Sequence, residues 1–159
     1  RSGKRDIHIV CTGKMEDTRN RKFIDNLQHR IDTMECRKNI HLLGYIPKDD
    51  QIAIMKKAVG LIQPTLFEGG PGGGSTYNAL CLGITCLLSD IPVNREVVGY
   101  DNVFFFEREN VQQLAQLMEA HRNDTPIEEE ILKKRVESNR KAYGEFLIAK
   151  LENIIAANK

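Results

Sequence analysis

Short apolar runs alternate with longer segments of helical periodicity along most of this 159-residue chain. Such alternation is typical of strands and helices that build a parallel sheet covered by helices. The apolar runs are continuous, which indicates strands buried on both faces. We therefore predict a single α/β, Rossmann-like domain over residues 1–159, with three layers, C-terminal helices and a parallel sheet of about five short strands. The predicted strands are 7-IHIVC-11, 40-IHLLG-44, 59-VGLIQ-63, 84-ITCLL-88 and 103-VFFF-106.

The segments between these runs predict helices. Apolar residues recur at helical spacing over residues 17–36, and residues 48–58 follow Pro47 with two aspartates in their first turn. A third helix is expected from near Ser75 to Gly83, a plausible C′ glycine. A fourth is expected to start at Asn110, with its apolar face formed by Val111, Leu114, Leu117 and Met118.

The last helix has the clearest predicted start. The run 125-TPIE-128 offers an N-cap threonine, a proline at the first helical position and a capping-box glutamate. From Glu128 to Lys159 the pattern is helical, with a break expected near Gly144. The charge runs 128-EEE-130 and 133-KKR-135 are interpreted as dipole complementation and a solvated face.

Composition excludes several classes of function. The formal net charge is +1, from 23 basic and 22 acidic residues, whereas an electrostatic nucleic-acid binder normally carries a strong basic excess. The apolar runs are too short to span a membrane, and no secretory leader is visible. The four cysteines form no CxxC pair and are interpreted as reduced packing residues. We therefore expect a cytoplasmic protein.

Histidines and nucleophiles show no catalytic pattern. The four histidines have no HExxH, H-x-E or Cys/His spacing, so we expect no metal site. No nucleophile elbow or Ser-His-Asp set is present. Asp90 and Glu96 have ordinary structural interpretations, as a turn cap and as an N-terminal helix charge.

A glycine-rich segment, 64-PTLFEGGPGGGSTYNALCLG-83, lies between a predicted strand and a predicted helix. In an open parallel sheet, ligands bind where strand-to-helix loops gather at the carboxyl ends of the strands. Glycines expose backbone N–H groups without side chains, and the positive end of the following helix attracts anions. Ser75 and Thr76 add hydroxyl groups. The segment therefore predicts a phosphate or diphosphate cradle.

Two familiar phosphate motifs do not fit this segment. A P-loop needs a lysine before its Ser or Thr, but Ser75 directly follows Gly74. The run 70-GPGGGS-75 has a serine where a dinucleotide fingerprint ends in glycine, and it does not follow the first strand. A surface loop without a ligand remains an alternative.

A wider pattern resembles the donor-binding C-terminal domain of family-4 (group 1) retaining glycosyltransferases, which have the GT-B arrangement of two Rossmann-like domains. The resemblance covers about residues 7 to 120 and rests on several motifs in the same order. These motifs are Gly44-Tyr45-Ile46, Pro64-Thr65, Glu68-Gly69, Ala79-Leu80, Gly83, Ser89-Asp90, and Pro92 with Glu96.

The resemblance implies roles for individual residues. Glu68 would be a catalytic-site glutamate that contacts hydroxyls of the donor sugar. Tyr45 and Ile46 would lie near the nucleotide base. The remaining donor-binding residues would be Gly69, Gly70, Gly72, Gly73, Gly74, Ser75, Thr76 and Asn78.

The sequence departs from the family pattern in two ways. The second glutamate of the family motif, which binds the donor ribose, is replaced by Asn78 in a loop that we interpret as two residues longer. An amide still forms hydrogen bonds but carries no charge. The strand-helix unit that usually precedes 7-IHIVC-11, with its basic diphosphate-binding residues, is not seen. We therefore expect an excised C-terminal fragment without the N-terminal acceptor domain.

The resemblance implies sugar transfer from a nucleotide-diphosphate sugar, with retention of configuration and no metal or other cofactor. The expected partners are the nucleotide sugar, the N-terminal Rossmann-like domain and an acceptor glycan, lipid or protein; nucleic acid is not expected. Peripheral membrane association of the full-length protein stays open. The fragment alone is expected to be inactive. Two alternatives remain: a degenerate module that binds a nucleotide sugar or a partner domain, and an unrelated nucleotide-binding Rossmann domain such as a dehydrogenase.

Overall fold

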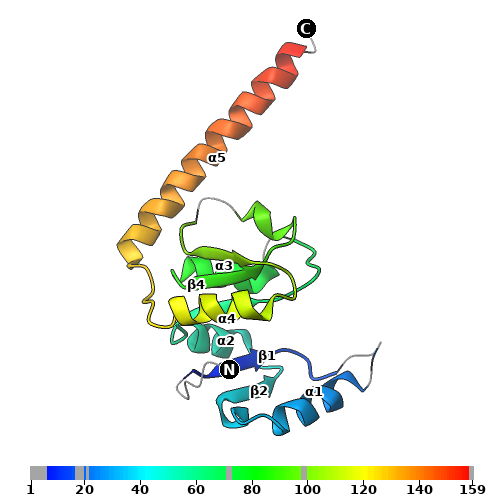
Figure 1. Cartoon of the computed structure of the whole chain (residues 1–159). Coiled ribbons are helices and arrows are strands. Elements are labelled where there is room, and N and C mark those ends of the chain that lie inside the picture. Colours follow the sequence, from blue (N-terminus) through cyan, green and yellow to red (C-terminus); the bar gives the residue numbers. More distant parts are fainter. Residues whose placement is uncertain (1–6, 17–19, 21, 71–72, 98–99, 158–159) are drawn as a thin grey trace. The chain divides into compact units, whose positions relative to one another are not determined.

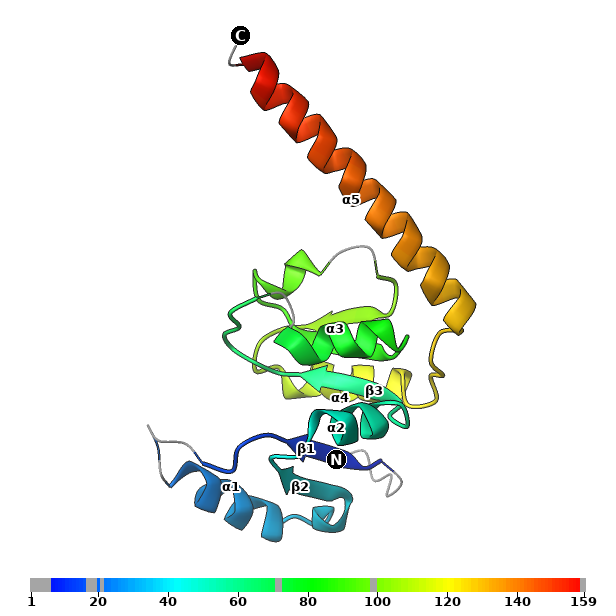
Figure 2. The ribbon, with the colours of Figure 1, turned by 180° about the vertical axis from the view of Figure 1, so that it is seen from behind.

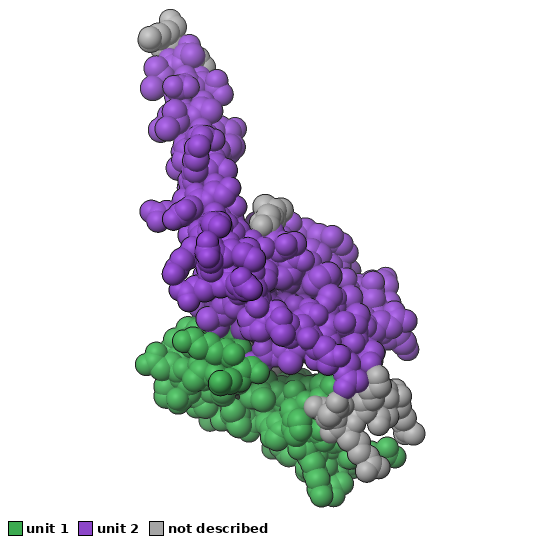
Figure 3. Space-filling view, turned by 90° about the vertical axis from the view of Figure 1, so that its left-hand side faces the viewer, with its two compact units in different colours: residues 1–57 green, residues 58–159 purple. Residues whose placement is uncertain are grey.

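The computed structural model describes residues 7–16, 20, 22–70, 73–97 and 100–157 (Figures 1 and 2). The chain divides into two compact units, residues 1–57 and 58–159, which Figure 3 colours separately. The first unit contains β1 (Ile9–Thr12), α1 (Phe23–Asp32), β2 (Ile40–Gly44) and α2 (Lys48–Met55). The second contains β3 (Gly60–Gln63), α3 (Gly73–Cys81), β4 (Thr85–Ser89), β5 (Val103–Phe106), α4 (Val111–Ala120) and α5 (Glu129–Ala157).

The predicted fold class is confirmed. All strand pairs in the described residues are parallel, and the helices alternate with the strands before the C-terminal helices. The strands form two sheets, ordered β1-β2 and β3-β4-β5. Each predicted strand lies within two residues of its observed position. Short apolar runs therefore located the strands well, because each is bounded by polar or glycine-containing turns.

The main hydrophobic core surrounds β4. This strand pairs with β3 on one edge and β5 on the other, and all five of its residues are buried. Helix α3 packs against β3 and β4, and α4 packs against β4 and β5. The expectation of a strand covered on both faces is met here. The buried apolar residues of this unit are Ala79, Leu80, Ile84, Cys86, Leu87, Leu88, Ile91, Val97 and Phe106.

A polar contact fixes the amino end of β4. The Thr85 hydroxyl donates to Asp124 Oδ2 at 2.6 Å, and His121 Nδ1 lies 2.9 Å from the same oxygen. Partial burial raises the pKa of Asp124, but the hydrogen bonds from Thr85 and His121 outweigh it and hold this pKa below its ordinary value. The charged carboxylate therefore ties the segment after α4 to the central strand.

The first unit is packed less deeply than predicted. Every residue of β1 is exposed and no residue of β2 is fully buried, so the prediction of burial on both faces is wrong for these strands. Within the described residues β1 pairs with β2 alone, and α1 contributes one fully buried side chain, Ile31. A two-stranded sheet with so little apolar cover leaves its side chains open to solvent.

The interpretation of the cysteines as packing residues holds for one of the four. Cys86 is buried in β4, and burial raises the pKa of its thiol to about 12. Cys11, Cys36 and Cys81 are exposed, and all four are free thiols. Cys11 lies in a strand whose residues are all exposed, Cys81 is the last residue of α3, and Cys36 lies in the turn after α1, so apolar neighbours did not ensure burial.

Two predictions for the last helix are wrong. The helix begins at Glu129 rather than after Thr125, because the Ile127 N–H donates to the carbonyl of Gly83 at 2.9 Å and holds the chain outside the helix. The helix also runs through Gly144 without a break. One glycine costs a helix only roughly 0.5–1 kcal/mol relative to alanine, which the residues on both sides offset. Among the described helices, none is long and apolar enough to cross a bilayer.

The predicted C′ glycine of the third helix is confirmed, although α3 starts two residues before Ser75. Gly83 has a φ of +68°, and the Ile84 N–H donates to the Ala79 carbonyl at 3.0 Å, as in a Schellman cap. The fourth helix also starts as predicted, with the Asn110 side chain accepting from the Gln113 N–H. Val111, expected on its apolar face, is exposed at its first turn.

Gly83→Ala is expected to destabilise the chain by about 2 kcal/mol or more, because left-handed φ costs about 1–2 kcal/mol for alanine. In addition, a Cβ there would lie 2.7 Å from the Ile127 nitrogen and 2.8 Å from its carbonyl oxygen. Urea unfolding of both proteins measures this loss. Gly74→Ala is the matched control, since a Cβ at Gly74 meets nothing within 4 Å. Equal stability of the Gly83 variant and the parent would contradict the prediction.

Candidate functional site

The carboxyl ends of β3, β4 and β5 lie at one edge of the second sheet. The three strands are parallel, with Gln63 opposite Leu88 and Ser89 opposite Phe106. The segments that follow them, starting at Pro64, Asp90 and Glu107, therefore gather at the same edge. This is the edge at which open parallel sheets bind ligands.

Glu68 is positioned by two residues of this edge. Gln63, the last residue of β3, donates from Nε2 to Glu68 Oε1 at 2.5 Å. A Cβ added at Gly73, the first residue of α3, would lie 3.2 Å from Glu68 Oε2. The carboxylate thus lies against the amino end of α3, where the helix dipole favours negative charge. Gln63 was not among the predicted site residues, although its place at a strand end was a usable signal.

The glycines of the loop differ in what surrounds them. Among the described residues, a Cβ at Gly69, Gly70 or Gly74 would meet no atom within 4 Å. Gly73 has a φ of +64°, and a Cβ there would lie close to the Glu68 carboxylate, so a side chain at this position would be strained. Gly72 lies outside the described residues. Packing within the chain therefore gives no reason for glycine at Gly69, Gly70 and Gly74.

The polar residues at the start of α3 have different environments. Ser75 is exposed. The side chain of Thr76 is fully buried, so it belongs to the packed face of the helix. Asn78 is half-buried, and its Nδ2 donates to the Gly74 carbonyl at 2.8 Å. Of the three side chains, Ser75 is the most open to solvent.

The residues predicted to lie near a base belong to the other compact unit. Tyr45 follows β2 and is 77% exposed. Ile46 is half-buried, and its carbonyl accepts from Gln51 Nε2 at 3.1 Å. Tyr45 therefore offers a free aromatic face at the carboxyl end of its own strand.

Hydrogen bonds join the segment after β3 to the segment after β4. The Ser89 hydroxyl donates to the Thr65 carbonyl at 2.5 Å. Asn94, which is fully buried, donates from Nδ2 to the Ser89 carbonyl at 2.9 Å. The loop after β3 is thus tied to the end of β4. The motifs Pro64-Thr65 and Ser89-Asp90 were recognised in the sequence as part of this region. Asn94 was not predicted to belong to it.

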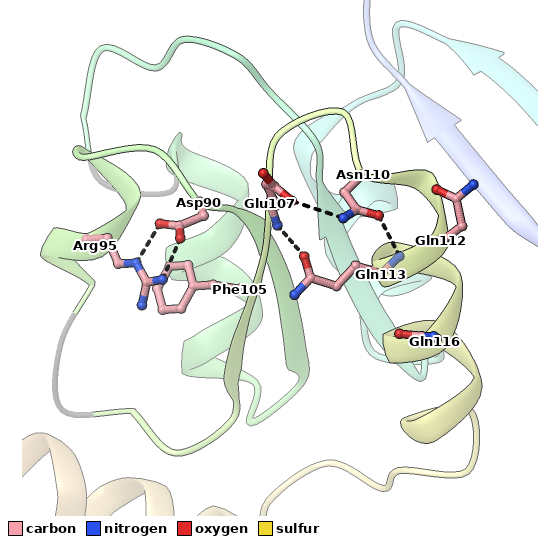
Figure 4. Close-up of a pocket in the computed structure, with 8 residues that line it drawn as sticks. All are labelled: Asp90, Arg95, Phe105, Glu107, Asn110, Gln112, Gln113 and Gln116. Carbon is pink, nitrogen blue, oxygen red and sulfur yellow. Dashed lines mark hydrogen bonds and ion pairs between the residues drawn. The ribbon is translucent and has the colours of Figure 1, made fainter.

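An open pocket of about 490 Å³ lies at the carboxyl ends of β4 and β5 (Figure 4). Arg95 makes two hydrogen bonds of 2.6 Å to the Asp90 carboxylate, and its guanidinium lies 4.3 Å from the centre of the Phe105 ring. No site was predicted there from the sequence, because the residues that line this pocket come from three separate segments of the chain. The lining residues are Asp90, Arg95, Phe105, Glu107, Asn110, Gln112, Gln113 and Gln116.

Charge in this pocket is partly paired. Hydrogen bonds from Arg95 are the main cause that holds the pKa of Asp90 below its ordinary value of 3.8. Both groups remain exposed to solvent, so the pair orients side chains more than it stabilises the fold. Within the described part of the chain, no group of three or more His, Cys, Asp or Glu side chains could hold a metal ion.

Comparison with known proteins assigns the family. The sequence model described as "Glycosyl transferases group 1" matches residues 3–142, most of the chain. The chain belongs to the group 1 glycosyl transferases. It is also 27% identical over 141 residues to "Glycosyltransferase 1 domain-containing protein 1" of Xenopus tropicalis. That match covers 87% of this chain and 36% of the relative, so this group 1 domain corresponds to about a third of that protein.

Membership confirms the family resemblance drawn from the motifs. The glycine-rich loop, Glu68 and the Asp90–Glu96 segment all lie inside the matched region of this group 1 domain. The roles of the individual residues remain predictions, because family membership does not establish which atoms of a substrate each one contacts.

The pKa of Asp90 provides a test of the pocket geometry. A lowered pKa means that the ion pair is intact above the ordinary carboxyl pKa and is lost as the pH falls through the folded-state value. We expect the Asp90 carboxyl carbon to titrate with a midpoint below 3.8 in NMR. Arg95→Gln should raise this midpoint toward 3.8, and Arg95→Lys should raise it less. An unchanged midpoint in Arg95→Gln would show that the pair does not form in solution.

Proposed function

We propose that this domain is the donor-binding half of a glycosyltransferase that moves a sugar from a nucleotide-diphosphate sugar to an acceptor, with retention of configuration. The hydrogen bond from Gln63 to Glu68, with the Glu68 carboxylate close to Gly73, carries the proposal. The Glu68 carboxylate lies beside the first turn of α3. A hydrogen-bond acceptor and the backbone N–H donors of the helix start therefore lie close together. A sugar diphosphate presents hydroxyl donors and anionic acceptors in the same arrangement.

Sugar transfer requires both a carboxylate and backbone N–H donors at its site. Negative charge develops on the departing diphosphate, and backbone N–H groups with the positive end of a helix stabilise such charge. The Glu68 carboxylate accepts hydrogen bonds from the sugar hydroxyls and holds the ring in place. The open space around Gly69, Gly70 and Gly74 leaves the backbone accessible to the diphosphate. Ser75 adds an exposed hydroxyl at the same helix start.

The complete reaction requires more than this domain. We propose that the acceptor binds to a second Rossmann-like domain of the full-length protein, and that transfer needs no metal. Tyr45, with its exposed ring, would stack on the nucleotide base. A cytoplasmic location agrees with a nucleotide-sugar substrate. We therefore expect this chain to bind donor without turning it over.

Calorimetric titration with UDP-, GDP- and ADP-sugars tests the donor site. Glu68→Ala is expected to weaken nucleotide-sugar binding at least tenfold, because a hydrogen bond to a charged group is worth about 1.5–3 kcal/mol. Gln63→Leu should weaken it in the same direction through loss of the bond that orients Glu68. The corresponding nucleoside diphosphates should bind both variants as they bind the parent, since Glu68 is proposed to contact the sugar.

Glu137→Ala, an exposed position on α5, is the matched control and should bind like the parent. If Glu68→Ala bound nucleotide sugars as tightly as the control does, the proposed role of Glu68 would be wrong. If neither this chain nor the full-length protein bound any of the three nucleotide sugars, the proposed donor site would be wrong.

A non-catalytic module is the second candidate, and one observation favours it. Asn78 replaces the expected glutamate, and its amide donates to the Gly74 carbonyl within α3. An amide occupied by its own helix offers a weaker partner to a ribose than a carboxylate does. Such a domain would bind a nucleotide sugar or a partner domain without supporting transfer.

Asn78→Glu discriminates between these two functions. In the enzyme hypothesis the domain already binds donor, and the added carboxylate should change nucleoside diphosphate affinity by threefold or less. In the module hypothesis it should increase affinity by about tenfold, as expected for a new charged hydrogen bond of about 1.5 kcal/mol. Transfer assays on the full-length protein with and without this change complete the test. Donor hydrolysis or transfer by the unaltered full-length protein would exclude the module.

A further inference from the structure

The pocket beside α4 shares no residue with the glycine-rich loop. It is formed by the ends of β4 and β5 and by one face of α4, where Gln112, Gln113 and Gln116 follow one another at helical spacing. Its volume of about 490 Å³ lies within the usual range of about 300–1,000 Å³ for small-molecule sites.

The rim of this pocket is held by a hydrogen-bond network. The Glu107 N–H donates to Gln113 Oε1 at 2.6 Å, and Asn110 Nδ2 donates to Glu107 Oε2 at 3.1 Å. Between these residues Glu109 adopts a φ of 60°, which is unfavourable for a residue other than glycine. Backbone of this kind persists where the surroundings hold it, and it is frequent at binding sites. The rim is therefore organised before any ligand arrives.

Two exposed polar side chains of the pocket have no hydrogen-bond partner among the described residues. The amides of Gln112 and Gln116 make no hydrogen bond within the described part of the chain, and Figure 4 draws none for them. Each amide offers a donor and an acceptor side by side. A hydroxyl group is also both donor and acceptor, so a ring bearing several hydroxyls matches this pair.

Charge and polarity argue against other ligands. Asp90 and Glu107 contribute two negative charges against the single positive charge of Arg95, so a phosphate would be repelled. An apolar ligand would find no free aromatic surface, because the Arg95 guanidinium covers the Phe105 ring. Both Asp90 oxygens are engaged by Arg95, which leaves them poorly placed for a cation.

We propose that this pocket binds a neutral, polyhydroxylated ligand, a sugar ring of a glycan, through the amides of Gln112 and Gln116 and the Glu107 carboxylate. The choice of a sugar among polyhydroxylated ligands rests on the proposed function, whereas the position and polarity of the pocket do not. Such a subsite would hold a glycan beside the donor edge of the sheet, separately from the donor itself.

Two-dimensional ¹H–¹⁵N NMR of this chain tests the proposal, with glucose, galactose, mannose and N-acetylglucosamine as probes. We expect saturable shifts of the Glu107 and Gln113 amides, with a dissociation constant on the order of 1–10 mM, as befits one small polar ring. The double variant Gln112→Ala/Gln116→Ala should weaken binding at least fivefold. Alanine favours helix, so α4 should be retained.

Two controls separate this site from the donor loop. Gln28→Ala replaces an exposed glutamine on α1 in the same way and should bind sugars like the parent. The inference would be overturned by the absence of saturable shifts with all four sugars, or by binding unaffected in the double variant. Shifts confined to the loop from Glu68 to Gly74, lost in Glu68→Ala, would also overturn it. Nucleotide-sugar titrations decide the proposed function independently of these outcomes.

Discussion

The burial of β4 is the constraint on which the second unit depends. A strand that pairs on both edges and buries every side chain has little freedom to shift, because a slip of one residue would move each side chain to the other face. Its two ends carry polar anchors. Thr85 binds Asp124 at the amino end, and Ser89 binds the Thr65 carbonyl at the carboxyl end. The buried strand therefore fixes the positions of the loops that are hydrogen-bonded to its two ends.

The candidate donor site combines a held carboxylate with an open backbone. Glu68 accepts a hydrogen bond from Gln63 and lies close to Gly73, while a Cβ at Gly69 or Gly70 would meet none of the described residues. A binding site needs both properties, since a fixed group gives orientation and an accessible backbone admits the ligand. The pocket beside α4 repeats this combination, with a hydrogen-bonded rim and two amides that bind no other described residue. Both lie on segments that follow the carboxyl ends of strands in the second sheet.

Much of the fold was predicted from local sequence patterns. The predictions that were wrong depend on contacts between residues far apart in the chain. The strands and the glycine cap of α3 were predicted because apolar runs and a left-handed glycine are local signals. The start of α5 was misplaced because Ile127 bonds to Gly83, a contact between residues far apart in the chain. Exposure of Cys11 and Cys81 was not foreseen, because apolar neighbours do not show which face a packed element will cover.

The sequence by itself determined the α/β class, the family and the loop containing Glu68, because each depends on residue types in a fixed order. Only the tertiary structure decided what surrounds them. It placed Gln63 against Glu68, buried Asn94 beneath Ser89 and brought Asp90, Phe105 and the glutamines of α4 around one pocket. Such contacts arise when parallel strands align their carboxyl ends, and no local pattern in the chain specifies which side chains then meet.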